Sequence, residues 1–138
     1  MLRAVLLGCA LAAAACSTPA SPTIATISEQ GLAGVWRLEV LQSAGQPALL
    51  PPAGSAYTLT FADGFVSPSG ACTSCDAGFT LIGDSLNVAQ IFSCGPTFCP
   101  IDSFTAQFRT ILAGESAVGV EGPRMSLVSG RGQLIFIR

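Results

Sequence analysis

Tyr57-Thr-Leu-Thr-Phe-Ala-Asp-Gly64 is the stretch of sequence that decides the fold. Large apolar side chains at Tyr57, Leu59 and Phe61 alternate with threonines, which is the period of a strand with one buried face. The Asp63-Gly64 pair that follows is typical of a tight hairpin turn. We therefore expect a half-buried strand that turns directly into a second strand.

The same alternation appears on the N-terminal side, where Trp36, Leu38 and Val40 alternate with charged residues. Towards the C-terminus, further turn signals separate short apolar runs. They are Gly83-Asp84, Glu121-Gly122-Pro123 and Ser129-Gly130-Arg131-Gly132. Together these patterns predict a meander of about seven or eight antiparallel strands.

One segment has a helical period. After Pro100, apolar residues recur at the spacing of one helix face, at Phe104, Phe108, Ile111 and Leu112. Asp102 or Ser103 is placed to cap this helix, and Gly114 to end it. The predicted class is α+β, mostly β, with a curved antiparallel sheet packed around one α-helix.

The N-terminus has the pattern of an export signal. Arg3 precedes an apolar run over 4–15, and small residues lie immediately before Cys16, as in a lipobox. We expect a signal peptide over 1–15, a lipidated N-terminus and flexible Ser/Thr/Pro linker over 16–29, and one domain over 30–138. Cys9 is a competing lipidation site behind a shorter apolar run, and a secretory leader without lipid is the remaining alternative.

This pattern predicts a location in the cell envelope. A diacylated Cys16 would anchor the protein in a membrane. By resemblance to known lipoproteins, Ser17 after it favours the outer membrane in a cell that has one. No apolar run reaches the roughly 18 residues that a spanning helix needs. Without Arg3 the chain carries five arginines against eight acidic residues, so we expect no nucleic-acid partner.

The composition removes much of the usual catalytic chemistry. The 138 residues include no histidine and no lysine, which excludes Ser-His and Cys-His pairs, imidazole metal ligands and Schiff-base lysines. The acidic residues weighed for acid-base catalysis lie mostly beside turn glycines or before the helix, where they have ordinary structural roles. They are Asp63, Asp76, Asp84, Asp102, Glu115 and Glu121. We expect no enzymatic activity, no cofactor and no metal.

Four mature cysteines need an explanation. Cys72-x-x-Cys75 and Cys94-x4-Cys99 allow two structural disulfides, a redox-active CxxC or a tetrathiolate zinc site. Export favours disulfides, because thiols that meet an oxidising compartment persist as paired cystines. Cys72 and Cys75 lie in a Gly/Ser/Thr-rich segment with no neighbouring cation in the sequence, which argues against a reactive thiolate there.

Most of the chain from residue 31 onward resembles the META domain of HslJ-like bacterial lipoproteins. The order and spacing of five segments agree with that family: Leu32-Ala-Gly-Val-Trp-Arg-Leu38, the Tyr57 to Gly64 strand and turn, Gly70-Ala-Cys-Thr-Ser-Cys-Asp-Ala-Gly-Phe79, the segment from Ser93 to Pro100, and Leu134 to Arg138. Thr73 and Phe79 depart from the family's usual Asn and Tyr.

The resemblance implies an envelope-attached domain with a curved antiparallel sheet around one helix and no established enzymatic activity. It also implies that Cys72 pairs with Cys99, which leaves Cys75 to pair with Cys94. We therefore expect a lipid-anchored, non-enzymatic domain that interacts with an unknown protein or component of the envelope.

Two other functions stay open. One is a small-molecule binding module with a lipocalin-like pocket, which a sealed concave face filled by side chains would exclude. The other is a thiol-redox protein that uses the CxxC. The aromatic residues Trp36, Tyr57, Phe61, Phe79 and Phe136 are expected in the core. The proline-rich loop with Leu49 and Leu50 is either a docking segment or a covered edge.

Overall fold

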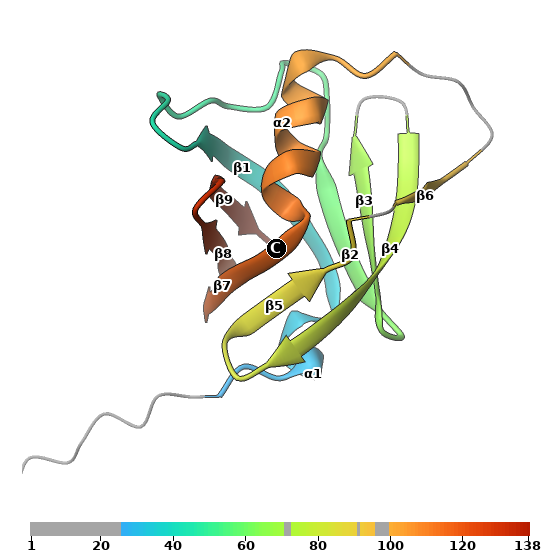
Figure 1. Ribbon diagram of the computed structural model, residues 1–138, viewed down its shortest axis with the longest axis vertical. Coiled ribbons are helices and arrows are strands. Elements are labelled where there is room, and N and C mark those ends of the chain that lie inside the picture. Colours follow the sequence, from blue (N-terminus) through green and yellow to red (C-terminus); the bar gives the residue numbers. More distant parts are fainter. Residues whose placement is uncertain (1–25, 71–72, 91, 96–99) are drawn as a thin grey trace, which may run out of the picture.

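A computed structural model of the protein describes residues 26–70, 73–90, 92–95 and 100–138 (Figure 1). These ranges hold nine strands and two helices. In chain order they are α1 (Glu29–Leu32), β1 (Gly34–Ser43), β2 (Thr58–Ala62), β3 (Phe65–Gly70), β4 (Thr73–Ile82), β5 (Ser85–Val88), β6 (Ser93–Cys94), α2 (Ser103–Leu112), β7 (Gly114–Glu121), β8 (Arg124–Ser129) and β9 (Gly132–Ile137).

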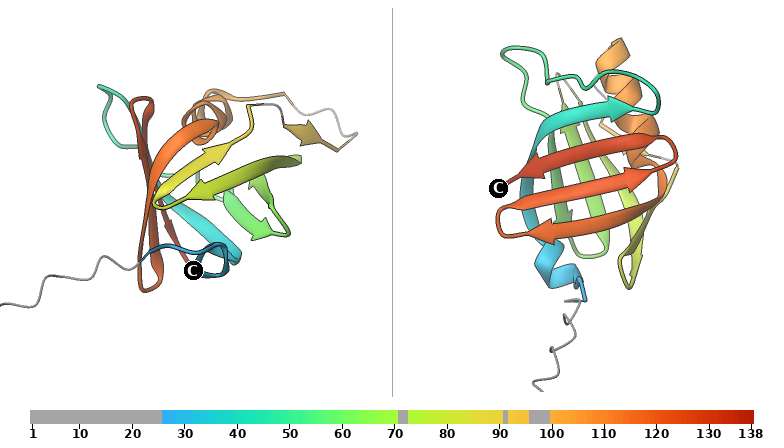
Figure 2. Two further views of the ribbon diagram at one scale, coloured as in Figure 1. Left: turned by 60° about the horizontal axis from the view of Figure 1, so that its bottom comes forward. Right: turned by 90° about the vertical axis from the view of Figure 1, so that its left-hand side faces the viewer.

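Eight of the strands form a closed antiparallel barrel. Each barrel strand pairs with the next one along the chain, β5 pairs with β7, and β9 returns to pair with β1. Figure 2 shows β1, β9, β8 and β7 side by side in this wall. The ninth strand, β6, pairs with β4 outside the ring. The mostly-β α+β class is confirmed, and the predicted curvature of the sheet continues to full closure.

The predicted turns all join neighbouring strands. Asp63 and Gly64 have φ angles of 53° and 77°, so both central residues of the β2–β3 hairpin adopt the left-handed conformation of a tight primed turn. The Gly83-Asp84 turn joins β4 to β5, and the two later turn signals join β7 to β8 and β8 to β9. These local signals therefore set the register of the meander.

The strands alternate in direction, so the barrel has two distinct ends. The α1 end holds α1, the C-terminus and the turns at 63–64, 83–84 and 121–123. The α2 end holds the 44–57 loop, α2 and the turn at 129–132 (Figure 1).

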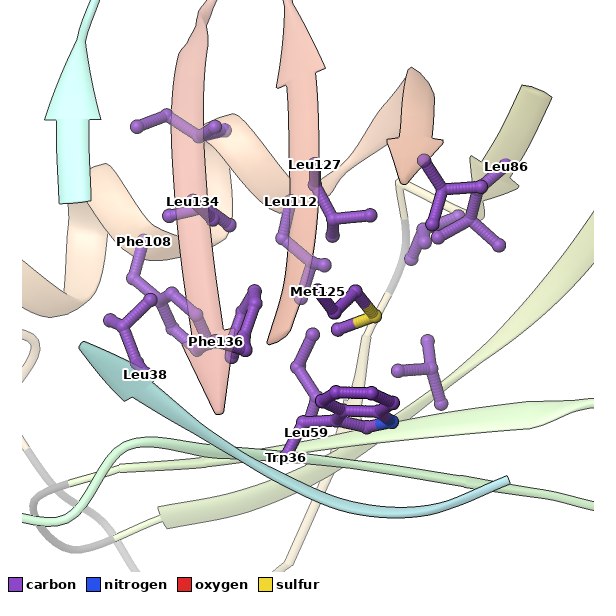
Figure 3. Packing of buried hydrophobic residues seen from close by; sticks show 14 of the residues in the cluster. Trp36, Leu38, Leu59, Leu86, Phe108, Leu112, Met125, Leu127, Leu134 and Phe136 are labelled. Atoms are coloured by element: carbon purple, nitrogen blue, oxygen red, sulfur yellow. The ribbon is translucent and has the colours of Figure 1, made fainter. Parts of the chain in front are cut away.

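The barrel interior is filled by the protein's own side chains. Figure 3 shows residues of β1, β2, β8, β9 and α2 converging on one cluster. Trp36, Met125 and Phe136 have no exposed surface, and Tyr57 and Phe108 are almost as completely buried. The expectation that Trp36, Tyr57, Phe61 and Phe136 lie in the core is confirmed, and Phe79 packs against it half-buried.

One predicted core position is wrong. Trp36 and Leu38 point into the barrel as expected, but Val40 is half-buried and Leu41 is fully buried instead. The register of β1 against β9 shifts between Leu38 and Val40, which marks a β-bulge at Glu39. Because a bulge inserts one extra residue, every later side chain of β1 changes face.

The α2 helix has the predicted residues and cap. Asp102 is the N-cap, and its carboxylate accepts a 2.7 Å hydrogen bond from the backbone N–H of Thr105. This hydrogen bond lowers the pKa of Asp102. The buried face of the helix includes Phe108, Ile111 and Leu112. The hydroxyls of Tyr57 and Thr105 share a 2.7 Å hydrogen bond, which satisfies both polar groups inside the core.

The one-turn helix α1 was not predicted. Leu32 at its end is fully buried, and its carbonyl accepts a 2.7 Å hydrogen bond from Nε1 of Trp36. The guanidinium of Arg138 lies 4.4 Å from the Trp36 ring centroid and donates to the carbonyl of Gly31. The last residue of the chain thus fastens the segment that leads into β1.

Replacing Phe108 with alanine tests the packing of α2 on the barrel. Its ring lies 5.5 Å from that of Tyr57 and 6.4 Å from that of Phe136. We expect Phe108→Ala to lower the free energy of unfolding by about 3–5 kcal/mol in urea denaturation. Phe65→Ala removes the same atoms from a side chain that is 55% exposed, so its effect should stay below about 1 kcal/mol. Equal effects would contradict this packing.

Candidate functional site

The acidic residues predicted to have structural roles are dispersed over the barrel. Asp63 and Asp84 lie in hairpin turns, Glu121 ends β7, and Asp102 caps α2. The hydroxyl of Ser67 donates to the carboxylate of Asp76, and Ser85 donates to Glu115. Among the described residues, no group of three or more Cys, Asp or Glu side chains comes together in a way that would hold a metal ion.

A disulfide joins Cys75 of β4 to Cys94 of β6, with 2.01 Å between the sulfurs. The two residues face each other across the β4–β6 ladder. Cys75 therefore bonds to a cysteine 19 positions further along the chain, and not to its CxxC neighbour. Cys72, Cys99 and the expected lipidation site Cys16 lie outside the described residues.

A cation lies beside this disulfide, contrary to the expectation from the sequence. A guanidinium nitrogen of Arg109, on α2, lies 3.3 Å from Sγ of Cys75. Local sequence could not reveal this contact, because 34 positions separate the two residues. Only the packing of α2 on the barrel brings them together.

The same arginine lines a surface cavity of about 390 Å³ at the α2 end of the barrel. The cavity lies between the last turn of α2, the segment after β5 and the β8–β9 turn. Its described lining residues include two arginines and no acid: Gln90, Phe92, Arg109, Thr110, Ala113 and Arg131. Its volume falls at the lower limit of the range for small-molecule sites.

Arg131 is held rigidly at the edge of this cavity. Its backbone N–H donates to the Ser129 hydroxyl, and its carbonyl accepts from the N–H of Ala44. Gly132 follows with φ 145°, and a Cβ there would lie 2.1 Å from the carbonyl oxygen of Gln42. Only glycine permits so close an approach of β9 to β1, and this approach positions Arg131.

The Arg131 guanidinium is only partly satisfied. One terminal nitrogen donates to the carbonyl of Glu115 at 2.8 Å and lies 3.4 Å from both the carbonyl of Ile111 and the hydroxyl of Ser116. Its Nε is buried and has no hydrogen-bond partner among the described residues. An unpaired buried donor on a charged group is costly, so this atom is a polar defect in the packing behind the cavity.

Basic residues outnumber acidic ones in the described lining of the cavity. The C-terminus of α2 contributes about half a negative charge, which the guanidinium at the Ile111 carbonyl partly offsets. Arg109 and Arg131 together contribute two positive charges. Acidic residues outnumber arginines in the domain as a whole, so two arginines without an acid in the described lining distinguish this cavity from the rest of the chain.

The proline-rich loop of the sequence also borders a depression at the α2 end. Leu49 forms a bridge with Leu41 and is 40% exposed, whereas Leu50 is 73% exposed. The depression measures about 530 Å³ and lies between this loop and the bulged half of β1. The loop therefore covers β1 near Leu41 and leaves Leu50 exposed to solvent.

Comparison with known proteins identifies the fold and no family. No family model matches the sequence, and no curated protein matches it. The chain is similar to the NMR structure of the protein from Burkholderia xenovorans, with a TM-score of 0.62 and 20% identity over 88% of this chain and 97% of that one. At this identity the similarity concerns the barrel architecture alone.

Proposed function

We propose that the chain is an envelope-attached, non-enzymatic module, held by a lipid on Cys16, that binds a protein or another envelope component on its outer surface. The N-terminal sequence supports the anchor, since a positive residue, an apolar run and small residues precede Cys16. Among the described residues, no helix is long and apolar enough to cross a membrane. The resemblance of residues 31–138 to META domains agrees with this proposal.

The observation that carries this proposal is the filled interior. Trp36, Phe108, Met125 and Phe136 occupy the space that an internal ligand would need in a lipocalin-like barrel. Close-packed side chains leave little room for a guest without large rearrangement. Recognition on the outside, around the loops and cavities of the α2 end, is the arrangement that this packing favours.

The cysteines support an oxidising location. Cys75 and Cys94 are bonded, and we propose a second disulfide between Cys72 and Cys99, as the family resemblance implies. Both bonds would tie the segment before α2 to the β3–β4 side of the barrel.

Mass spectrometry of the protein purified from its native membrane tests the anchor and the second bond. We expect the mature chain to begin at an acylated Cys16, and its mass to rise by about four hydrogens on reduction. Cys16→Ala should abolish the acyl mass and leave both disulfides in place. A native chain with an unmodified Cys16 and free thiols at Cys72 and Cys99 would contradict the proposal.

A second candidate function is the binding of a small oxyanion-bearing molecule in the cavity of Arg109 and Arg131. The observation that favours it is the lining of the cavity, whose described residues include two arginines and no acid. A planar guanidinium matches the oxygens of a phosphate or carboxylate. This version of the small-molecule hypothesis places the ligand outside the barrel.

Titration with inorganic phosphate and with acetate tests this cavity. In NMR spectra of the full chain in detergent, we expect saturable shifts of the amide signals of Thr110, Ala113 and Arg131. Arg131→Lys keeps the charge and removes the planar guanidinium, so it should weaken binding, whereas Arg124→Gln at the opposite end should not. Shifts no larger than those caused by chloride at equal ionic strength would contradict binding.

A further inference from the structure

We propose that Cys94 is a site of reversible S-thiolation. A low-molecular-weight thiol attacks the Cys94 sulfur of the Cys75–Cys94 disulfide, and Cys75 is the sulfur that leaves. The inference goes beyond the proposed function and does not depend on it. It rests on three features of this bond: the difference in exposure of its two sulfur-bearing residues, the guanidinium beside one of them, and its place outside the barrel ring.

The two ends of the bond have very different access to solvent. Cys75, on β4, is 1% exposed. Cys94 is exposed, on a strand of two residues that pairs with β4 alone. An attacking thiolate must reach a sulfur directly, so it meets Cys94 first.

The positive charge of the Arg109 guanidinium lies beside the sulfur of Cys75. Arg109 approaches Sγ of Cys75 to 3.3 Å. A neighbouring cation stabilises a thiolate, and a more stable leaving thiolate departs faster in disulfide exchange. Exposure thus selects Cys94 as the attacked sulfur, and the guanidinium favours Cys75 as the leaving one.

The exchange step is balanced. The incoming thiolate forms a new S–S bond to Sγ of Cys94, and the Cys75–Cys94 bond breaks. The electron pair of the broken bond passes to Sγ of Cys75, which leaves as a thiolate beside Arg109. The incoming sulfur is oxidised and Cys75 is reduced, so no further oxidant or reductant is needed.

Loss of this bond need not disrupt the barrel. The eight-stranded ring closes through β3–β4 and β1–β9 without β6. The bond instead ties the segment around β6 to the barrel wall. S-thiolation would therefore remove the covalent link between β6 and β4, while the ring of strands remains paired.

Brief reaction of the native full chain with glutathione, followed by alkylation with iodoacetamide and peptide mapping, tests which of the two sulfurs is attacked. We expect glutathione on Cys94 and the carbamidomethyl group on Cys75. Glutathione on Cys75, or a Cys75–Cys94 bond that resists glutathione until the protein is unfolded, would overturn the proposal. Acylation of Cys16 is scored separately, so failure here leaves the envelope proposal untouched.

The rate of exchange tests the role of Arg109. Arg109→Gln should slow the opening of the bond about fivefold, the size of one partly exposed ionic contact, and Arg109→Lys should retain most of the wild-type rate. Arg124→Gln makes the same charge change at the α1 end and should have no effect. Circular dichroism would verify that each variant is folded. Equal rates in Arg109→Gln and Arg124→Gln would remove Arg109 from the mechanism.

Discussion

The pairing of β1 with β9 is the constraint on which the rest of the structure depends. These are the first and last of the described strands, and their ladder converts a meander into a closed barrel. Closure removes the open edges of the sheet and fixes the interior volume, which the aromatic residues then fill. The ladder also explains why residue 132 is a glycine, because β9 approaches the backbone of Gln42 too closely there for any side chain. Arg131 therefore takes its place at the cavity as a consequence of closure.

Both ends of the barrel are completed by short segments outside the ring. At the α1 end, Leu32 is buried and its carbonyl accepts from Trp36, and Arg138 covers the indole ring. At the α2 end, the helix inserts Phe108 and carries Arg109 to the disulfide. With the interior occupied, the chemically distinctive groups lie on the outside of the α2 end. They are the two guanidiniums, the exposed Cys94 and Leu50 of the proline-rich loop.

Local signals were sufficient to predict most of the fold. The alternation at Tyr57, Leu59 and Phe61 and the turn glycines predicted the strands and hairpins, and the spacing from Phe104 to Leu112 predicted α2. The bulge at Glu39 had no such signal, because it follows from how β1 meets β9. The helix α1 depends on the burial of Leu32 and not on any helical period. The site was harder still to predict from the sequence, since Arg109 and Cys75 meet only through tertiary packing.

A barrel interior filled by its own side chains is the feature that directs binding to the outer surface. Methyl NMR spectra of the full chain under increasing xenon pressure test this claim directly, because xenon enters dry apolar cavities without needing a polar partner. We expect the methyl signals of Leu59, Leu127 and Leu134, which lie inside the barrel, to show no saturable shift. Saturable shifts of these signals would reveal an internal cavity and contradict the account.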